Sequence, residues 1–200
     1  MNLVKNKYRT LAPQASYLHD TVVLAQAWKK AHTYIRRHNW YADTLELDCS
    51  AVDLDNKLAE WAAALSDRSY RPAPAWLVPA PKNAAWVFNP LLKGGWGPKE
   101  TGSPPVLRPL AHLGIREQTV ATALMLCLAD CVESAQGNPA SAPEKALAND
   151  VFSYGNRLYC NWTNGGRRAR FSWGNANTYS RYFQDYQQFV ARPAAVARRD

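Results

Sequence analysis

Residues 104–133 read PPVLRPLAHLGIREQTVATALMLCLADCVE, and this stretch decides the fold class that the sequence predicts. Arg108 precedes Pro109, and a residue before proline is restricted to extended backbone, so we expect Arg108 on a strand. From Ile115 to Glu133, apolar residues recur at helical spacing and predict a helix. Its expected buried stripe comprises Val120, Ala123, Leu124, Cys127, Leu128 and Cys131. A rigid arm that carries an arginine, followed by a buried helix, suggests a device that faces phosphate groups.

The chain before this stretch has a helical part and then a part rich in proline and glycine. Helices are expected over residues 16–37 and 53–65 because apolar residues keep near-helical spacing there. Further along we expect short strands and an exposed loop, with the strands at 75–79, 84–88 and 106–110 and the loop at 90–105. The first and last of these strands would form antiparallel arms that hold Lys82 close to Arg108.

The chain after the helix returns to mixed structure. A Gly-Gly break at 165–166 precedes a basic strand-like run at 167–173. A closing amphipathic segment over 179–197 contains Pro193, which we expect to split it into two helices. Together these elements predict an α+β fold, with an N-terminal helical region over residues 1–68 and a second region over residues 69–200.

The net charge of +8 is concentrated toward the C-terminal end. The last fifty residues hold eight arginines but only two aspartates, and nine aromatic residues between positions 154 and 186 are interleaved with them. Arginine forks onto phosphates and aromatic rings stack on bases, so this mixture indicates binding of single-stranded nucleic acid. A solvated basic face over an ordinary aromatic core would have the same composition.

The sequence argues against a membrane protein and a metal protein. No apolar run is long enough to span a bilayer, and the N-terminal MNLVKNKYRT lacks the apolar core of a signal peptide. We therefore expect a cytoplasmic protein. The four cysteines include no C-x-x-C pair and the four histidines show no ligand spacing, so reduced structural thiols are expected in place of a metal site.

Four short motifs occur in a distinctive order. They are P-K at 81–82, L-R-P-L at 107–110, I-R-E-Q-T-V-A-T-A at 115–123 and F-S-Y-G-N-R at 152–157. In this order and with these gaps the chain resembles bacterial reverse transcriptases, both the group II intron-type enzymes and especially their relatives in anti-phage defence. The resemblance covers about residues 40–192. It implies reverse-transcriptase-like fingers with a short antiparallel hairpin, followed by helices that lead into a palm.

The resemblance also implies roles for particular residues. Lys82 and Arg108 match the fingers residues that bind the triphosphate of the incoming dNTP. Template contacts are implied for Arg116, Gln118, Ser153, Tyr154, Gly155 and Arg157, and nucleic-acid backbone contacts are expected for Arg167, Arg168 and Arg170. Simpler explanations stay open: an arginine paired with a carboxylate such as Glu117, a salt bridge of Arg116 at the helix start, and a core aromatic and a turn glycine at 154 and 155.

The metal-binding half of such an enzyme is missing from this sequence. Reverse transcriptases hold two Mg²⁺ ions on palm aspartates, but no Asp-x-x-x-Phe-Tyr or Tyr-x-Asp-Asp motif is present, and Tyr41-Ala42-Asp43-Thr44 lacks the second aspartate. We therefore expect no catalytic residue and no polymerase activity from residues 1–200 alone. Mg²⁺, an RNA template, a DNA product and a palm on a continuation or partner chain are expected for the complete polymerase. The alternatives are a non-catalytic single-stranded RNA- or DNA-binding module and a structural subunit.

Overall fold

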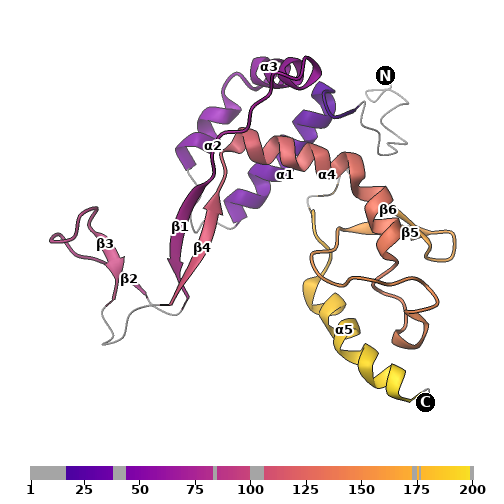
Figure 1. Cartoon of the computed structure of the whole chain (residues 1–200). Helices are drawn as coiled ribbons and strands as arrows, with labels where there is room; N and C mark the ends of the chain where they lie inside the picture. The colour runs from indigo at the N-terminus through magenta and orange to yellow at the C-terminus, as the bar shows by residue number, and fades with distance from the viewer. Residues whose placement is uncertain are drawn as a thin grey trace. The chain divides into compact units, whose positions relative to one another are not determined.

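The computed structural model describes residues 17–37, 44–82, 85–99, 106–172, 175 and 177–198. Expectations for residue 16, for residues 41–43, 83–84 and 100–105 and for Trp173 lie outside these ranges. Helices and small antiparallel hairpins make up the chain, as the predicted α+β class requires (Figure 1). The chain forms two compact units, one from Met1–Tyr70 with Ile115–Asp200 and one from Arg71–Gly114. The chain leaves the larger unit after Tyr70 and returns to it at Ile115.

The core of the larger unit is built from three helices, one of which is far from the other two in the sequence. Helix α1 (Thr21–Arg37) packs along α4 (Ile115–Gln136), and α3 (Leu54–Ser66) packs against α1, with the short α2 (Thr44–Ala51) between α1 and α3 in the chain (Figure 1). The buried apolar side chains at their contacts include Val23, Leu24, Ala27, Leu58, Trp61, Ala123, Leu126 and Cys127. The predicted helices over 16–37, 53–65 and 115–133 are thus confirmed, apart from their exact ends.

The buried face of α4 differs from the predicted one. Ala123, Leu126 and Cys127 face the core, whereas Leu124 and Leu128 are about half exposed, at 49% and 48%, and Cys131 is exposed. The predicted stripe was therefore rotated around the helix axis. The reason is that α4 is apolar on more than one side, so spacing alone does not determine which side packs on α1.

The smaller unit contains the predicted pair of antiparallel arms. Strand β1 (Trp76–Pro81) pairs with β4 (Leu107–His112), in a register that places Val78 opposite Leu110 and Ala80 opposite Arg108. The ladder continues one step further, where the Lys82 amide donates to the carbonyl of Val106 at 2.8 Å. Bonded and unbonded pairs alternate in an antiparallel ladder. The prolines of both strands therefore fall at positions whose amide would point outward, and no ladder bond is lost.

A second hairpin joins the strand predicted at 84–88 to a strand in the segment that was predicted to be a loop. Strand β2 (Trp86–Phe88) pairs with β3 (Trp96–Pro98), and the Phe88 and Trp96 rings meet edge to face with centroids 5.6 Å apart. The turn between them is closed by the Asn89 amide, which donates to the Gly95 carbonyl at 2.7 Å. The prediction of a loop over 90–105 is thus wrong for Trp96–Pro98, since a three-residue strand containing Gly and Pro leaves no periodic signal.

The C-terminal part of the larger unit consists of a hairpin and a helix. Strand β5 (Cys160–Thr163) pairs with β6 (Arg168–Phe171) across the Gly165-Gly166 turn, and a short 3₁₀ helix, η3 (Pro143–Lys145), precedes them. Helix α5 (Tyr182–Ala197) runs through Pro193 without ending there, so the predicted split is wrong. Anchors on both sides of the proline explain its tolerance: Arg192 donates to the Val151 carbonyl at 2.7 Å and Ala195 is buried.

Two sets of polar contacts attach the β5–β6 hairpin to the helices. On α4, Asp130 accepts the Phe171 amide at 2.7 Å and the Ser134 hydroxyl accepts the Ala169 amide at 2.9 Å. On α1, the buried Lys30 ammonium donates to the Asn175 carbonyl at 2.7 Å and lies 4.8 Å from the centre of the Phe171 ring. Burial, with a smaller contribution from Lys29, lowers the pKa of Lys30 to about 8.

Among the described helices, none combines the length and the apolar character needed to cross a bilayer.

Candidate nucleic-acid interface

Lys82 and Arg108 lie on the same face of the β1–β4 hairpin. Arg108 is opposite Ala80, and Lys82 follows Ala80 by two residues, so the period of two directs both side chains to one side. The two residues are diagonal neighbours across the ladder, and the Cα atoms of such neighbours are about 7–8 Å apart. Both side chains are exposed. Two long cationic side chains on one exposed face can bind one polyphosphate together.

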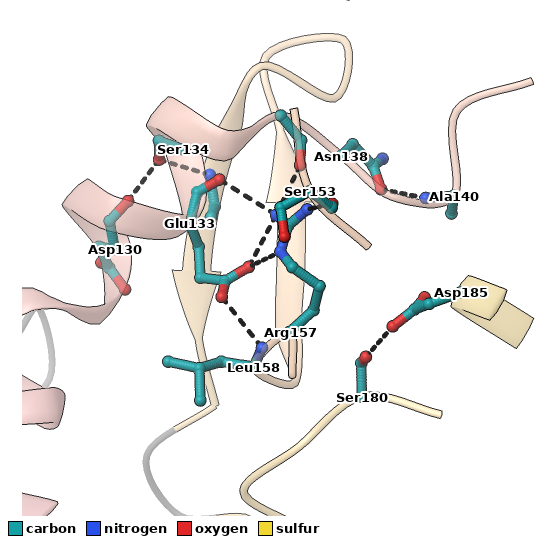
Figure 2. Close-up of polar contacts among 12 residues, drawn as sticks. Asp130, Glu133, Ser134, Asn138, Ala140, Ser153, Arg157, Leu158, Ser180 and Asp185 are labelled. Atoms are coloured by element: carbon teal, nitrogen blue, oxygen red, sulfur yellow. Dashed lines mark hydrogen bonds and ion pairs between the residues drawn. The ribbon is translucent and has the colours of Figure 1, made fainter. Parts of the chain in front are cut away.

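Arg157 has a very different environment from the one that a template contact would need. Its guanidinium is fully buried beside Glu133: Nε donates to Oε2 at 2.8 Å, and Nη2 lies 2.8 Å from the same oxygen (Figure 2). The guanidinium also donates to backbone carbonyls, from Nη1 to Ser153 at 2.6 Å and from Nη2 to Gly137 at 2.6 Å. The second carboxylate oxygen of Glu133 accepts the Leu158 amide at 3.0 Å.

This arrangement gives Arg157 a structural role at the end of α4. The helix ends at Gln136, and Gly137 follows with φ 73°, the left-handed conformation that commonly terminates helices. A cation at this end favours the helix dipole, and its bonds to the Glu133 and Gly137 carbonyls satisfy groups that the helix leaves without partners. With its donors used internally and its side chain fully buried, Arg157 does not have the exposure that the expected template contact requires.

The residues that precede Arg157 line a groove against α5. Ser153, Tyr154 and Gly155 form one wall of a cavity of about 900 Å³, and the rings of α5 form the other. Gly155 is exposed and has open space around its Cα, whereas Tyr154 is buried and its ring lies 6.0 Å from that of Phe189. The three predicted template residues therefore line the same groove. The Tyr154 ring is packed in the interior, whereas Gly155 is exposed.

The α5 wall of the groove is an exposed row of aromatic rings. Tyr182, Tyr186 and Phe189 recur at helical spacing, and the first two rings are nearly parallel, with centroids 5.9 Å apart and an interplanar angle of 16°. The Phe189 ring lies 6.3 Å from that of Tyr186. The only acidic residue of this helix, Asp185, lies three positions after Tyr182, is buried and accepts a hydrogen bond from Ser180 (Figure 2).

The three arginines of the basic run sit at the tip and on the outer face of the β5–β6 hairpin. Along β6 exposure alternates, so Arg168 and Arg170 project outward while Ala169 and Phe171 are buried, and Arg167 is exposed in the turn before the strand. Thr163 and Asn161 are the cross-strand partners of the two strand arginines. An outer face with two arginines and two small polar groups suits a nucleic-acid backbone.

Arg116 and Gln118 lie in the first turn of α4. Arg116 pairs with Glu117, with NH2 2.7 Å from Oε1, and its guanidinium lies 5.5 Å from the centre of the Tyr70 ring. This is the salt bridge at the helix start that the sequence left open as an alternative. Gln118 is half-buried.

Burial dominates the electrostatics around the β5–β6 hairpin. It raises the pKa of Asp130, against the opposing effects of the Phe171 amide and of Arg170 and Arg168. It also raises the pKa of Cys160 to about 12, with Glu133 and Asp130 adding to the effect.

The described residues do not fit the Mg²⁺ expected for a complete polymerase, because no three His, Cys, Asp or Glu side chains among them gather in a way that could hold a metal ion.

Comparison of the chain with protein-family models, with curated proteins and with solved structures gives no match. The resemblance to reverse transcriptases therefore rests on the sequence motifs.

Sequence reasoning missed the Glu133–Arg157 pair and the groove. The pair had no signal, since the two residues are 24 positions apart and the F-S-Y-G-N-R motif that contains Arg157 implied a template contact instead. In the closing amphipathic segment, the spacing i, i+4 and i+7 of Tyr182, Tyr186 and Phe189 does predict a single aromatic face, but nothing in the sequence indicated that the loop at 152–155 faces it.

Proposed function

We propose that this chain is the fingers part of a bacterial RNA-directed DNA polymerase of the kind used in anti-phage defence, and that it binds the incoming dNTP and the template. The observation that carries the proposal is the position of Lys82 and Arg108 as exposed diagonal neighbours on one face of the β1–β4 hairpin. The motif order in the sequence supports the same function. The metal-binding half of the active site would come from a palm on a continuation or partner chain.

The chemistry required of these two residues is electrostatic. A dNTP carries its negative charge on three linked phosphates, and phosphoryl transfer is promoted by fixed positive groups around them. Arg108 can fork onto two phosphate oxygens, while Lys82 supplies a point charge. Within the described residues neither side chain makes a hydrogen bond or ion pair with a carboxylate, so both are available to an anion.

The test is a comparison of triphosphate binding with RNA binding. Arg108→Ala should weaken binding of a fluorescent dNTP by about 10- to 100-fold, since a charge-assisted contact contributes roughly 1.5–3 kcal/mol. Its affinity for a single-stranded RNA should change far less. Lys93→Ala, which removes an exposed lysine in the turn of the β2–β3 hairpin, is the matched control and should leave both affinities unchanged. Equal losses for dNTP and RNA in Arg108→Ala would show that the assigned role is wrong.

A second candidate function is a non-catalytic module for single-stranded nucleic acid, and the outward-facing Arg168 and Arg170 favour it. This function predicts salt-sensitive RNA binding that does not depend on a nucleotide. Arg170→Ala should weaken RNA binding on every sequence and reduce the slope of log K against log salt by about one. Affinity that is insensitive to salt would count against this function.

A further inference from the structure

The groove between α5 and the loop at Phe152–Gly155 has features of a stacking site. Its volume of about 900 Å³ is at the upper end of the range for small-ligand pockets. Its lining is mostly apolar and includes, beside Pro193, Val196 and Ala197, five aromatic rings: Phe152, Tyr154, Tyr182, Tyr186 and Phe189. Tyr182 and Tyr186 stay 59% and 49% exposed, which is unusual for large aromatic side chains unless something covers them.

Charge around the groove favours a polyanion. Among the described residues of α5 and its flanks, the charged side chains with exposed surface are Arg181, Arg192 and Arg198. Arg192 lines the groove, is half-buried and donates to the Val151 carbonyl. Asp185 is buried. A partner with acidic or phosphate groups would therefore meet positive charge on the described surface of this helix. Aromatic rings flanked by arginines are the combination that single-stranded nucleic acids bind, through base stacking and backbone charge.

One polar group in the wall lacks a partner. Tyr154 is buried, with 8% of its surface exposed, and among the described residues its hydroxyl makes no hydrogen bond. A buried hydroxyl without a partner is costly, and Tyr154 is one of the residues that line the groove. Gly155 beside it leaves open space, where a side chain would narrow the entrance.

We propose that this groove binds the bases of a single-stranded nucleic acid, which stack on the Tyr182–Tyr186–Phe189 row while the phosphates lie near Arg192 and near the arginines at the two ends of α5, Arg181 and Arg198. This inference rests on the proposed function, because it assigns the place where template bases bind. One wall of the groove belongs to the F-S-Y-G-N-R motif, and the inference adds the aromatic row of α5, which no motif contains. Stacking on such a row is tolerant of sequence, so the groove selects for bases as a class and not for one base.

The experiment uses the full chain and two labelled ten-nucleotide probes, an oligouridylate and an abasic ribose-phosphate oligomer of equal charge. The wild-type chain should bind the oligouridylate about tenfold more tightly than the abasic probe. Tyr186→Leu, which keeps an apolar side chain but removes the ring, should abolish most of this difference, and Tyr186→Trp should retain it. Val190→Ala is the control on the same helix, because Val190 is 54% exposed but does not line the groove.

The outcomes separate this inference from the function on which it rests. If both probes bind with equal affinity and Tyr186→Leu changes neither, the groove is not a base-binding site although the chain still binds nucleic acid. If neither probe binds even at low salt, the proposed function fails together with the inference. Base-independent binding combined with a self-association that Tyr186→Leu removes would overturn the inference in favour of a protein interface.

Discussion

Replacing Arg157 by methionine tests whether this arginine stabilises the fold or contacts a ligand. The substitution removes the bonds to the Glu133 carboxylate and to the Ser153 and Gly137 carbonyls. Glu133 would keep the Leu158 amide as a donor but would remain buried without its cation. Loss of one partner of a buried ion pair typically costs about 3–5 kcal/mol, because the remaining charge has neither water nor a counter-charge.

The assay is urea unfolding followed by tryptophan fluorescence, since the chain contains eight tryptophans. Arg157→Met should lower the free energy of unfolding by about 3 kcal/mol or more. The double variant Arg157→Met with Glu133→Gln should recover a large part of this loss, because the glutamine keeps an acceptor for the Leu158 amide but carries no charge. Arg170→Met, at an exposed arginine of β6, should stay within about 0.5 kcal/mol of the wild type.

The reasoning would be refuted by the opposite pattern. If Arg157→Met costs less than about 1 kcal/mol while the folded protein loses affinity for single-stranded RNA, then the side chain leaves its buried position to contact the template. An unchanged RNA affinity together with a large loss of stability would confirm the structural role.

Two further predictions concern stability. Between pH 8 and 9 the wild type should gain about 1 kcal/mol of stability that Lys30→Met lacks, because the pKa of Lys30 is about 8 in the fold against an ordinary 10.5, so the unfolded chain binds more protons there. The measurement stays below pH 9 because the pKa of Cys160 is raised to about 12, and above its ordinary value this thiol lowers the stability of the fold as the pH rises. Parallel pH profiles of the unfolding free energy for wild type and variant would refute the prediction for Lys30. Gly137→Ala should cost at least about 1 kcal/mol, since its Cβ would lie 2.4 Å from the Asp150 carbonyl at a φ of 73°, while Gly155→Ala, with open space, should be neutral in the same measurement.

Much of the fold could be predicted because long elements leave periodic signals. The helices around Leu24, Leu58 and Leu126 and the β1–β4 pair follow from apolar spacing and from the extended backbone before Pro109. The buried side of α4 could not, since the exposed Leu124 and Leu128 are as apolar as the buried positions. Only the packing partner α1 decides between the two sides.

The candidate site was predictable where it depends on register and not where it depends on long-range packing. Once the two strands pair with Ala80 opposite Arg108, Lys82 and Arg108 must share a face. The burial of Arg157 depends on Glu133, which a separate element brings to it. The position of Arg157, two residues after Gly155, does not by itself show whether the arginine contacts a ligand or stabilises the fold.

The prolines of the β1–β4 hairpin have a consequence for the behaviour of the chain in concentrated solution. A two-stranded ribbon has two open edges, and here Trp76 and Leu77 are 73% and 75% exposed, which would ordinarily invite another strand to add. Pro79 and Pro109 oppose each other at positions whose amides would point outward, so each edge lacks a donor where an incoming strand would need it. The hairpin can thus expose apolar side chains and still resist edge-to-edge aggregation.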